Sequence, residues 1–191
     1  MKRRYFFILL IAAAVIWASC GNNMKPRKTT DGLQTVQKFS AQDIALWQAS
    51  MTPDGSAKGS AKFNPEDNGY TVITVGTESW GGVQSQTVSL DMTQPTYIGV
   101  RIKECSEPFN WTLKFVPDTP MNEDHKWGFY MIEDNNIRWD KYVLVNVNEQ
   151  IGDNIIKLYG GKIEGKLLIW AAGAANAQIE VREIIIFHGN P

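Results

Sequence analysis

The sequence predicts an all-β protein, a two-sheet antiparallel β-sandwich of the jelly-roll type. Three observations support this prediction. Roughly ten short apolar segments follow one another, about every ten to fifteen residues. Several of them alternate apolar and polar residues, the period of a strand with one buried face, and glycine-rich turns separate them. No segment of ten or more residues carries the 3.6-residue apolar repeat of an amphipathic helix.

The individual strands follow from local composition. Residues 70–75 read Tyr-Thr-Val-Ile-Thr-Val, a β-branched and aromatic run between Asn68-Gly69 and Gly76. Strict alternation predicts three more strands, at 98–102, 111–115 and 143–147. Further strands are expected at 83–90, 127–132, 155–159, 167–171 and 178–187, with polar stretches such as 148–152 as turns.

The segment that precedes these strands allows two interpretations. Ser40-Ala-Gln-Asp43 has the pattern that caps a short helix, which would lead into Ile44, Leu46 and Trp47. The same three apolar residues fit a strand equally well. Both alternatives stay open on the sequence.

The N-terminus has the order of a bacterial secretory signal peptide. Three basic residues lie in the first four positions, residues 6–16 are apolar, and small residues precede Cys20. The apolar run is short for a membrane span. The end of this segment resembles a lipobox: Ala18, Ser19 and Gly21 fit, whereas Trp17 stands where leucine is usual. The resemblance implies a lipid on the Cys20 sulfur and cleavage just before it; the alternative is an ordinary cleaved signal with an incidental cysteine.

These features divide the chain into three parts. We expect a signal peptide over residues 1–19, a lipid-anchored tether over 20–33 and one β-sandwich domain over 34–191. Gly21 does not resemble the aspartate that retains lipoproteins at the inner membrane, which indicates the outer membrane. Residues 21–25 lack the acidic residues found after the cysteine in surface-exported lipoproteins, which favours a periplasm-facing anchor.

Charge and cysteine content exclude some partners. Beyond residue 19 the chain carries 16 basic and 20 acidic residues, a formal net charge of −4, and its single basic cluster is 25–28. A nucleic-acid partner is therefore not expected, because phosphate binding needs clustered Lys and Arg. That cluster could instead rest on anionic headgroups beside the anchor. Cys105 has no second cysteine to pair with apart from Cys20, and we expect it to be a small buried apolar residue.

The order of these segments resembles galactose-binding-domain-like jelly rolls over about residues 45–188. The resemblance lies in the strand 70–75, in Trp80-Gly-Gly-Val-Gln-Ser85, and in Val88-Ser-Leu-Asp-Met-Thr-Gln-Pro95, a strand that closes on a turn with leucine, aspartate and proline. The strands 97–103 and 111–115 and a late strand ending at Phe187 also fit. Carbohydrate-binding modules belong to this superfamily, so the resemblance implies a jelly-roll fold and carbohydrate as a ligand.

Tryptophan supplies the candidate binding residues. Flat aromatic faces cover the C–H patches of sugars, while Asn, Asp, Gln or Arg bind the hydroxyls. Trp111, Trp170 and Trp47 lie in apolar or alternating contexts and are expected in the core. The other three tryptophans beyond residue 19 lie in polar, loop-like sequence contexts. Each could form an exposed aromatic surface for a sugar or could fill one end of the sandwich. The expected carbohydrate-binding residues are Trp80, Trp127, Trp139, Glu78, Asn135 and Asn136.

Catalysis and metal binding have less support. His125 and His188 are the only histidines, and no nucleophile elbow, phosphate-binding loop or Cys-x-x-Cys motif occurs. Acidic clusters at 66–68, 123–124 and 133–135 allow either plain turns or the oxygen ligands of one structural calcium, and no other cofactor is expected.

The sequence therefore favours a non-catalytic carbohydrate-binding lipoprotein of the bacterial envelope. A second hypothesis is an envelope scaffold whose sandwich binds another protein. A glycan-active enzyme is the third, because paired carboxylates can converge in three dimensions.

Overall fold

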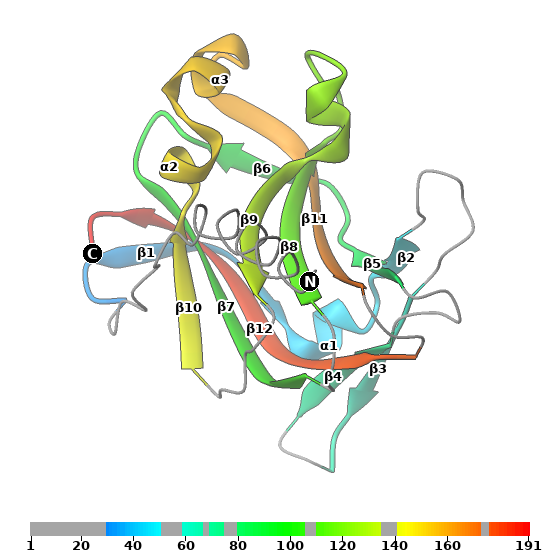
Figure 1. Ribbon diagram of the computed structural model, residues 1–191. Coiled ribbons are helices and arrows are strands. Elements are labelled where there is room, and N and C mark those ends of the chain that lie inside the picture. Colours follow the sequence, from blue (N-terminus) through cyan, green and yellow to red (C-terminus); the bar gives the residue numbers. More distant parts are fainter. Residues whose placement is uncertain are drawn as a thin grey trace, which may run out of the picture.

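The computed structural model describes residues 30–50, 59–66, 69–74, 80–105, 110–134, 141–172 and 176–191. These residues form two antiparallel sheets that pack face to face (Figure 1). The predicted all-β sandwich is therefore confirmed.

One layer, sheet A, has the order β10-β7-β12-β4-β3, and β1 pairs with β12 beside β4. Its central strand β12 is long enough to pair with β1 along 183–189 and with β4 along 178–181 on the same edge. The strands are β1 (Leu33–Ser40), β3 (Ser60–Asn64), β4 (Tyr70–Thr74), β7 (Thr96–Cys105), β10 (Lys141–Asn146) and β12 (Gln178–Gly189).

The second layer, sheet B, has the order β2-β5-β11-β8-β9. β5 and β6 share one edge of the central strand β11: β5 pairs with 168–172 and β6 with 162–165. The strands are β2 (Gln48–Ser50), β5 (Trp80–Gln84), β6 (Val88–Asp91), β8 (Asn110–Pro117), β9 (Phe129–Asp134) and β11 (Lys162–Ala172).

The strand order is that of a jelly roll. From β4 onward the chain crosses repeatedly between the layers, so that sheet A contains the neighbours β4-β12-β7-β10 and sheet B the neighbours β5-β11-β8-β9. All pairings between described strands are antiparallel. This double winding closes both sheets around one core.

The core fills the space between the sheets. β8 contributes Trp111, Leu113 and Phe115, which are all essentially inaccessible to water. The neighbouring strand β11 contributes Leu167 and Ile169, which pair with Phe115 and Leu113. Trp111 is thus a core residue, as expected. Trp47 packs against the edge of this core, with its ring centroid 5.4 Å from that of Phe39.

Four short helices complete the described residues. α1 (Ala41–Ile44) resolves the alternative left open by the sequence, because Ser40 and Asp43 form a capping box. α2 (Val147–Ile151), α3 (Asp153–Leu158) and the 3-10 helix η1 (Asp124–Trp127) lie at one end of the sandwich, at the top in Figure 1. No helix in these ranges is long and apolar enough to cross a membrane.

These elements correct six expectations. The segment 155–159 belongs to a helix and not to a strand, and 148–151 is helical as well. Trp127 precedes its strand, and Val147 opens α2. The expected strand 83–90 is two strands, β5 and β6. Between them the Ser85 amide donates to the Leu167 carbonyl at 2.9 Å, while the Ser85 hydroxyl, in place of a backbone carbonyl, accepts the Leu167 amide at 2.9 Å. The first strand, β1, was not expected.

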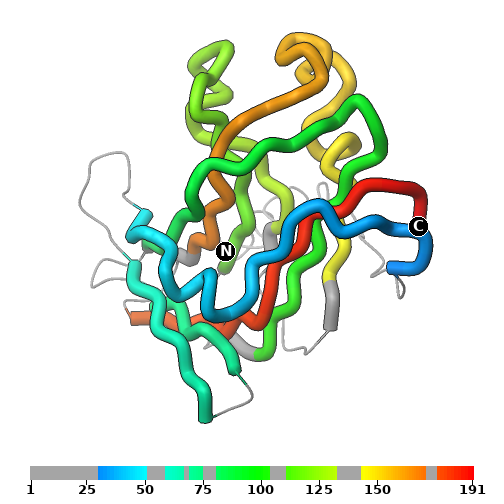
Figure 2. Tube along the Cα trace, turned by 180° about the vertical axis from the view of Figure 1, so that it is seen from behind, coloured from blue at the N-terminus to red at the C-terminus, as the bar shows by residue number. Residues whose placement is uncertain are grey.

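The first described residues lie beside the C-terminus. Leu33 pairs with Gly189, and β1 then runs antiparallel to β12 as far as Ser40 and Glu183. Figure 2 shows the two segments side by side from behind. An N-terminal tether would therefore enter the domain at the start of β1, next to the end of β12.

A network around Asp91 fixes the turn between β6 and β7. One carboxylate oxygen accepts the Thr93 amide at 3.1 Å and the Thr93 hydroxyl at 2.5 Å, and the other lies 2.9 Å from Lys162 Nζ. These hydrogen bonds, the one from the Thr93 hydroxyl first, lower the pKa of Asp91 to about 2. The aspartate of the Leu-Asp…Pro turn thus stabilises the turn in its charged form.

We expect Asp91→Asn to lower the melting temperature by a few degrees at pH 7, because the amide cannot replace the ionised acceptor. The folded-state pKa lies below the unfolded value of 3.8, so this contribution is present above pH 4 and lost as the pH falls towards 2. Thermal melts between pH 2 and 7 should therefore converge at the acid end. Asp31→Asn, at an exposed turn, is the control, and a gap that stays constant down to pH 2 would contradict this account.

Candidate functional site

A groove of about 570 Å³ crosses the outer face of sheet B, the face turned away from the core. β5, β8, β9 and β11 supply its floor, and η1 contributes to its wall. Side chains alternate between the two faces of a strand. In β8 and β11 the residues between the core positions therefore point to the outer face, where the groove lies.

The strand register aligns four side chains across the floor. Tyr130 on β9 pairs with Lys114 on β8, Lys114 pairs with Leu168 on β11, and Leu168 pairs with Gln84 on β5. A bulge between Leu113 and Lys114 makes this row possible. The pairing skips Met131, which is buried beside Ile132, and so Tyr130 faces outward.

Lys114 lies between two aromatic rings. Its ammonium is 4.0 Å from the Tyr130 ring centroid and 4.8 Å from that of Trp170. The lysine is only 7% exposed, whereas Tyr130 is 48% exposed. Cation–π contacts of a desolvated ammonium contribute about 2 kcal/mol. The rings therefore hold the cation in place and leave much of Tyr130 open to a ligand.

Trp127 forms the wall at the end of η1. It is 50% exposed, and the Lys126 ammonium lies 5.5 Å from its ring centroid. Lys126 in turn forms an ion pair with the exposed Glu123, which lowers the pKa of that carboxyl through the hydrogen bond and the charge of the lysine. Asp118 also lines the groove, and it accepts a hydrogen bond from the Thr87 hydroxyl at 2.6 Å.

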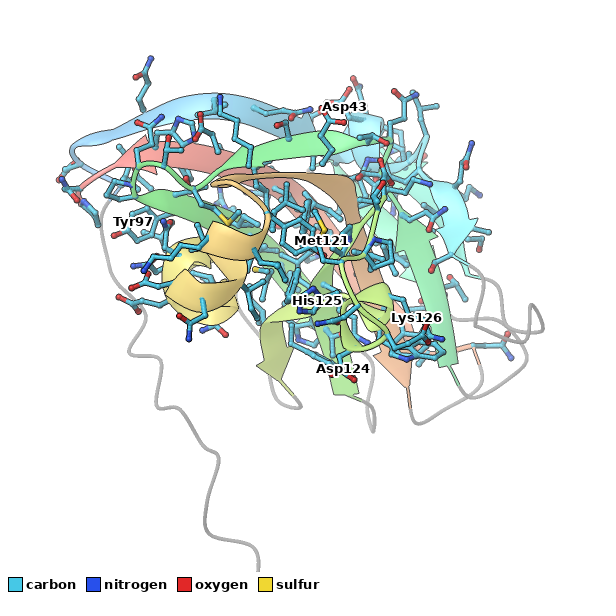
Figure 3. All side chains as sticks on the ribbon, turned by 90° about the horizontal axis from the view of Figure 1, so that it is seen from above. Asp43, Tyr97, Met121, Asp124, His125 and Lys126 are labelled. Carbon is cyan, nitrogen blue, oxygen red and sulfur yellow. The ribbon has the colours of Figure 1, made fainter. Side chains whose placement is uncertain are left out.

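A buried histidine attaches η1 to the sandwich. His125 Nδ1 lies 3.0 Å from the Tyr159 hydroxyl, and its backbone amide donates to Asn122 Oδ1 at 2.9 Å. The Tyr159 hydroxyl also accepts the Met121 amide at 3.0 Å. Figure 3 shows His125 on the side of η1 towards α2 and α3, and Lys126 on the other side.

Gly128 ends η1 and positions the wall against β8. Its φ is +77°, and a Cβ at this position would lie 2.6 Å from Val116 Cγ2 and 2.7 Å from the Phe115 carbonyl oxygen. Only glycine tolerates both the conformation and the close approach. His125 and Gly128 together fix where Trp127 stands over the groove.

The expected site residues have different outcomes. Trp127 is exposed and lines the groove, and its binding role stays a prediction. The backbone of Trp80 begins β5, but its side chain lies outside the described residues. Glu78, Asn135, Asn136, Trp139 and Cys20 lie outside them as well, and so does the side chain of Cys105.

The sequence interpretation of Trp170 was wrong, and two further groove residues were missed. Trp170 is not a core residue: it lines the groove two positions after Leu168 on the outer face of β11. Tyr130 and Lys114 were not identified as candidates. The available signal for Lys114 is the alternation of 111–115, which places Thr112 and Lys114 on the face opposite to Trp111, Leu113 and Phe115.

The acidic clusters do not gather around a metal in the described ranges. No group of three or more His, Cys, Asp or Glu side chains there could hold an ion. Glu123 is engaged with Lys126, as described above. The structural calcium that the sequence allowed as an alternative to plain turns is not tested by these residues.

Fold and groove together define the class: a jelly-roll domain with an open groove of aromatic and lysine side chains. No protein-family model matches the chain, and no curated protein matches it.

Three solved structures are similar in fold. The first is a low-affinity xylan-binding module from the gut symbiont Roseburia intestinalis, with a TM-score of 0.42 and 13% identity over 81% of this chain and 95% of that chain. The second is a carbohydrate-binding module in complex with β-1,4-galactotriose, with a TM-score of 0.42 and 14% identity over 76% and 90%. The third is a xylan-binding domain from Paenibacillus barcinonensis, with a TM-score of 0.38 and 15% identity over 85% and 99%.

We expect Tyr159→Phe to loosen the wall without unfolding the sheets, because the change removes one acceptor and one partner of the buried histidine. The loss should be about 1–2 kcal/mol. Hydrogen exchange should accelerate at the amides of 121–128, while β8 and β11 keep their protection. Tyr130→Phe is the matched control, because the Tyr130 hydroxyl makes no hydrogen bond to a described residue. Equal loss of protection in all strands would contradict a local role.

Proposed function

We propose that this chain is a non-catalytic carbohydrate-binding lipoprotein of the bacterial cell envelope, and that the groove of sheet B holds the glycan. The observation that carries the proposal is the row of four side chains across the groove. The exposed Tyr130 ring and the Gln84 amide lie at its two ends, and Lys114 and Leu168 lie between them. Trp127 stands over this row from η1.

The groove has the chemistry that a sugar ring requires. Exposed faces of Trp127 and Tyr130 can cover apolar C–H patches, and Gln84 and Asp118 offer amide and carboxylate groups for hydroxyls. The volume of about 570 Å³ lies within the usual range for small-ligand sites. Because the groove lies on the outer face of a sheet, a chain of sugars can extend beyond it.

The charged groups of the groove favour binding over hydrolysis. Glycosidases need two carboxyl groups on opposite sides of the scissile bond. Among the described lining residues Asp118 is the single acidic side chain, and it accepts a hydrogen bond from Thr87. The proposal therefore assigns no catalytic step to the groove.

The envelope location is proposed from the N-terminal sequence. A lipid on Cys20 would hold the protein at the outer membrane, on its periplasmic side, with residues 20–33 as the tether. Because β1 begins at Leu33, such a tether would join the sandwich directly.

We expect Trp127→Ala and Tyr130→Ala each to weaken glycan binding about tenfold or more, the effect of losing roughly 1.4 kcal/mol of stacking. The ligand would first be found by screening the full chain, purified in detergent, on a glycan array, and its affinity measured by calorimetry. Leu46→Ala, at an exposed apolar residue outside the groove, should bind as the unchanged protein does.

A folded protein that binds no glycan on the array would overturn the proposed function. The hypothesis of an envelope scaffold would then be tested by searching for a protein partner. Binding that survives both aromatic substitutions would instead show that the glycan does not use this groove.

We expect Cys20→Ser to abolish the lipid modification, because the thiol that accepts the lipid is absent. Mass spectrometry of the N-terminus measures this. Met24→Ser, four residues further on, is the control and should stay lipid-modified. A lipid-modified N-terminus in Cys20→Ser would contradict a lipid anchor at this residue.

A further inference from the structure

The floor of the groove holds a buried cation that no described carboxylate neutralises. Lys114 is 7% exposed, and its ammonium forms no ion pair or hydrogen bond with a group that the structure describes; the side chain of Glu133 on β9 lies outside the described ones. Its close neighbours are the faces of Tyr130 and Trp170. Lys114 lines the groove, where the two ring faces replace part of the water around its ammonium and an anion that enters the groove can approach it.

Two more lysines line the same groove. Lys166 on β11 is half-buried and forms no ion pair with a described residue, and Lys126 projects from η1. Glu123 pairs with Lys126 but is itself largely exposed, so water and salt weaken that neutralisation. The three lysines come from three different elements and converge on one surface.

The groove is therefore positively charged in a chain whose overall formal charge is −1. The described lining residues include three lysines and one carboxylate, Asp118, which is already bonded to Thr87, while Glu123 outside the lining pairs with Lys126. A neutral sugar would leave the charge of Lys114 uncompensated and would cover it further. A sugar with an anionic substituent would supply a counter-charge to the lysines that line the groove.

We propose that the groove selects acidic glycans, whose carboxylate or sulfate groups bind Lys114 and Lys166 while the sugar rings lie against Trp127 and Tyr130. This inference rests on the proposed function and narrows its substrate class. The shared chemistry is an oxyanion on a sugar ring. A uronic acid and a sulfate ester both provide it, and the experiment separates these two sources.

The test compares charged glycans with their neutral counterparts on the full chain in detergent. One arm uses oligogalacturonate and its methyl-esterified form, and the other uses a sulfated galactan oligosaccharide and its desulfated form. Calorimetry should give at least tenfold tighter binding of the acidic member in one arm, and the arm that responds identifies the source of the anion. Raising the NaCl concentration to about 0.5 M should weaken acidic binding several-fold, because the Debye length falls well below that at physiological salt.

Variants then locate the selectivity. Lys114→Met keeps an apolar chain of similar length between the two rings and should reduce the acidic-over-neutral preference at least tenfold. Lys166→Gln, at a more exposed position, should reduce it several-fold, and it serves as the second variant if Lys114→Met does not fold. Lys62→Gln, which removes the same charge from an exposed position on β3 of the other sheet, should leave the preference unchanged.

The outcomes separate this inference from the proposed function. Neutral glycans that bind through Trp127 as tightly as their acidic forms would overturn the inference and leave carbohydrate binding in place. A preference for acidic forms that survives Lys114→Met and Lys166→Gln would also overturn it. Failure of the array and of both arms to show any binding would overturn the proposed function and the inference with it.

Discussion

The structure depends on the register of β11 between β8 and β5. That register places Leu167 and Ile169 in the core and, at the intervening positions, Leu168 and Trp170 on the outer face. A shift by one residue would exchange the two sets, so the hydrophobic effect that buries the core also fixes the groove. Strand pairing alone therefore aligns the side chains of the groove floor. The bulge at Met131 extends the same row to the edge strand β9.

The wall of the groove is built on a different principle from its floor. The floor is positioned by strand pairing, whereas η1 is positioned by hydrogen bonds of a buried histidine and a tyrosine and by the close approach of Gly128 to β8. Short segments outside a sheet gain little stability of their own. The backbone at Trp127 is thus fixed while its ring is exposed. This arrangement limits the conformational entropy that is lost when a ligand binds.

The sequence allowed the sandwich to be predicted but not most of the site. Alternation identified β7 and β8 because one face of each strand is polar or small. It failed for Trp170, because Leu167-Leu-Ile-Trp170 is apolar on both faces and only the second sheet decides which face it covers. It failed for α3 as well: Ile155, Ile156 and Tyr159 fit a helical stripe, but five residues are too few to distinguish the two periods. The meeting of Trp127, Tyr130 and Lys114 depends on a bulge and a 3-10 helix, which no local pattern indicates.

The pairing of β1 with the end of β12 has a mechanical consequence. If the chain is held at its N-terminus while a glycan is held in the groove, tension enters the domain at Leu33, opposite Gly189. A pull along the axis of β1 loads the β1–β12 hydrogen bonds together, so that they share the force, whereas a pull across the sheet would break them one after another. Resistance to forced unfolding is set by the barrier and not by the equilibrium stability. The orientation of β1 relative to the membrane would therefore determine how long an anchored domain keeps hold of a moving polymer.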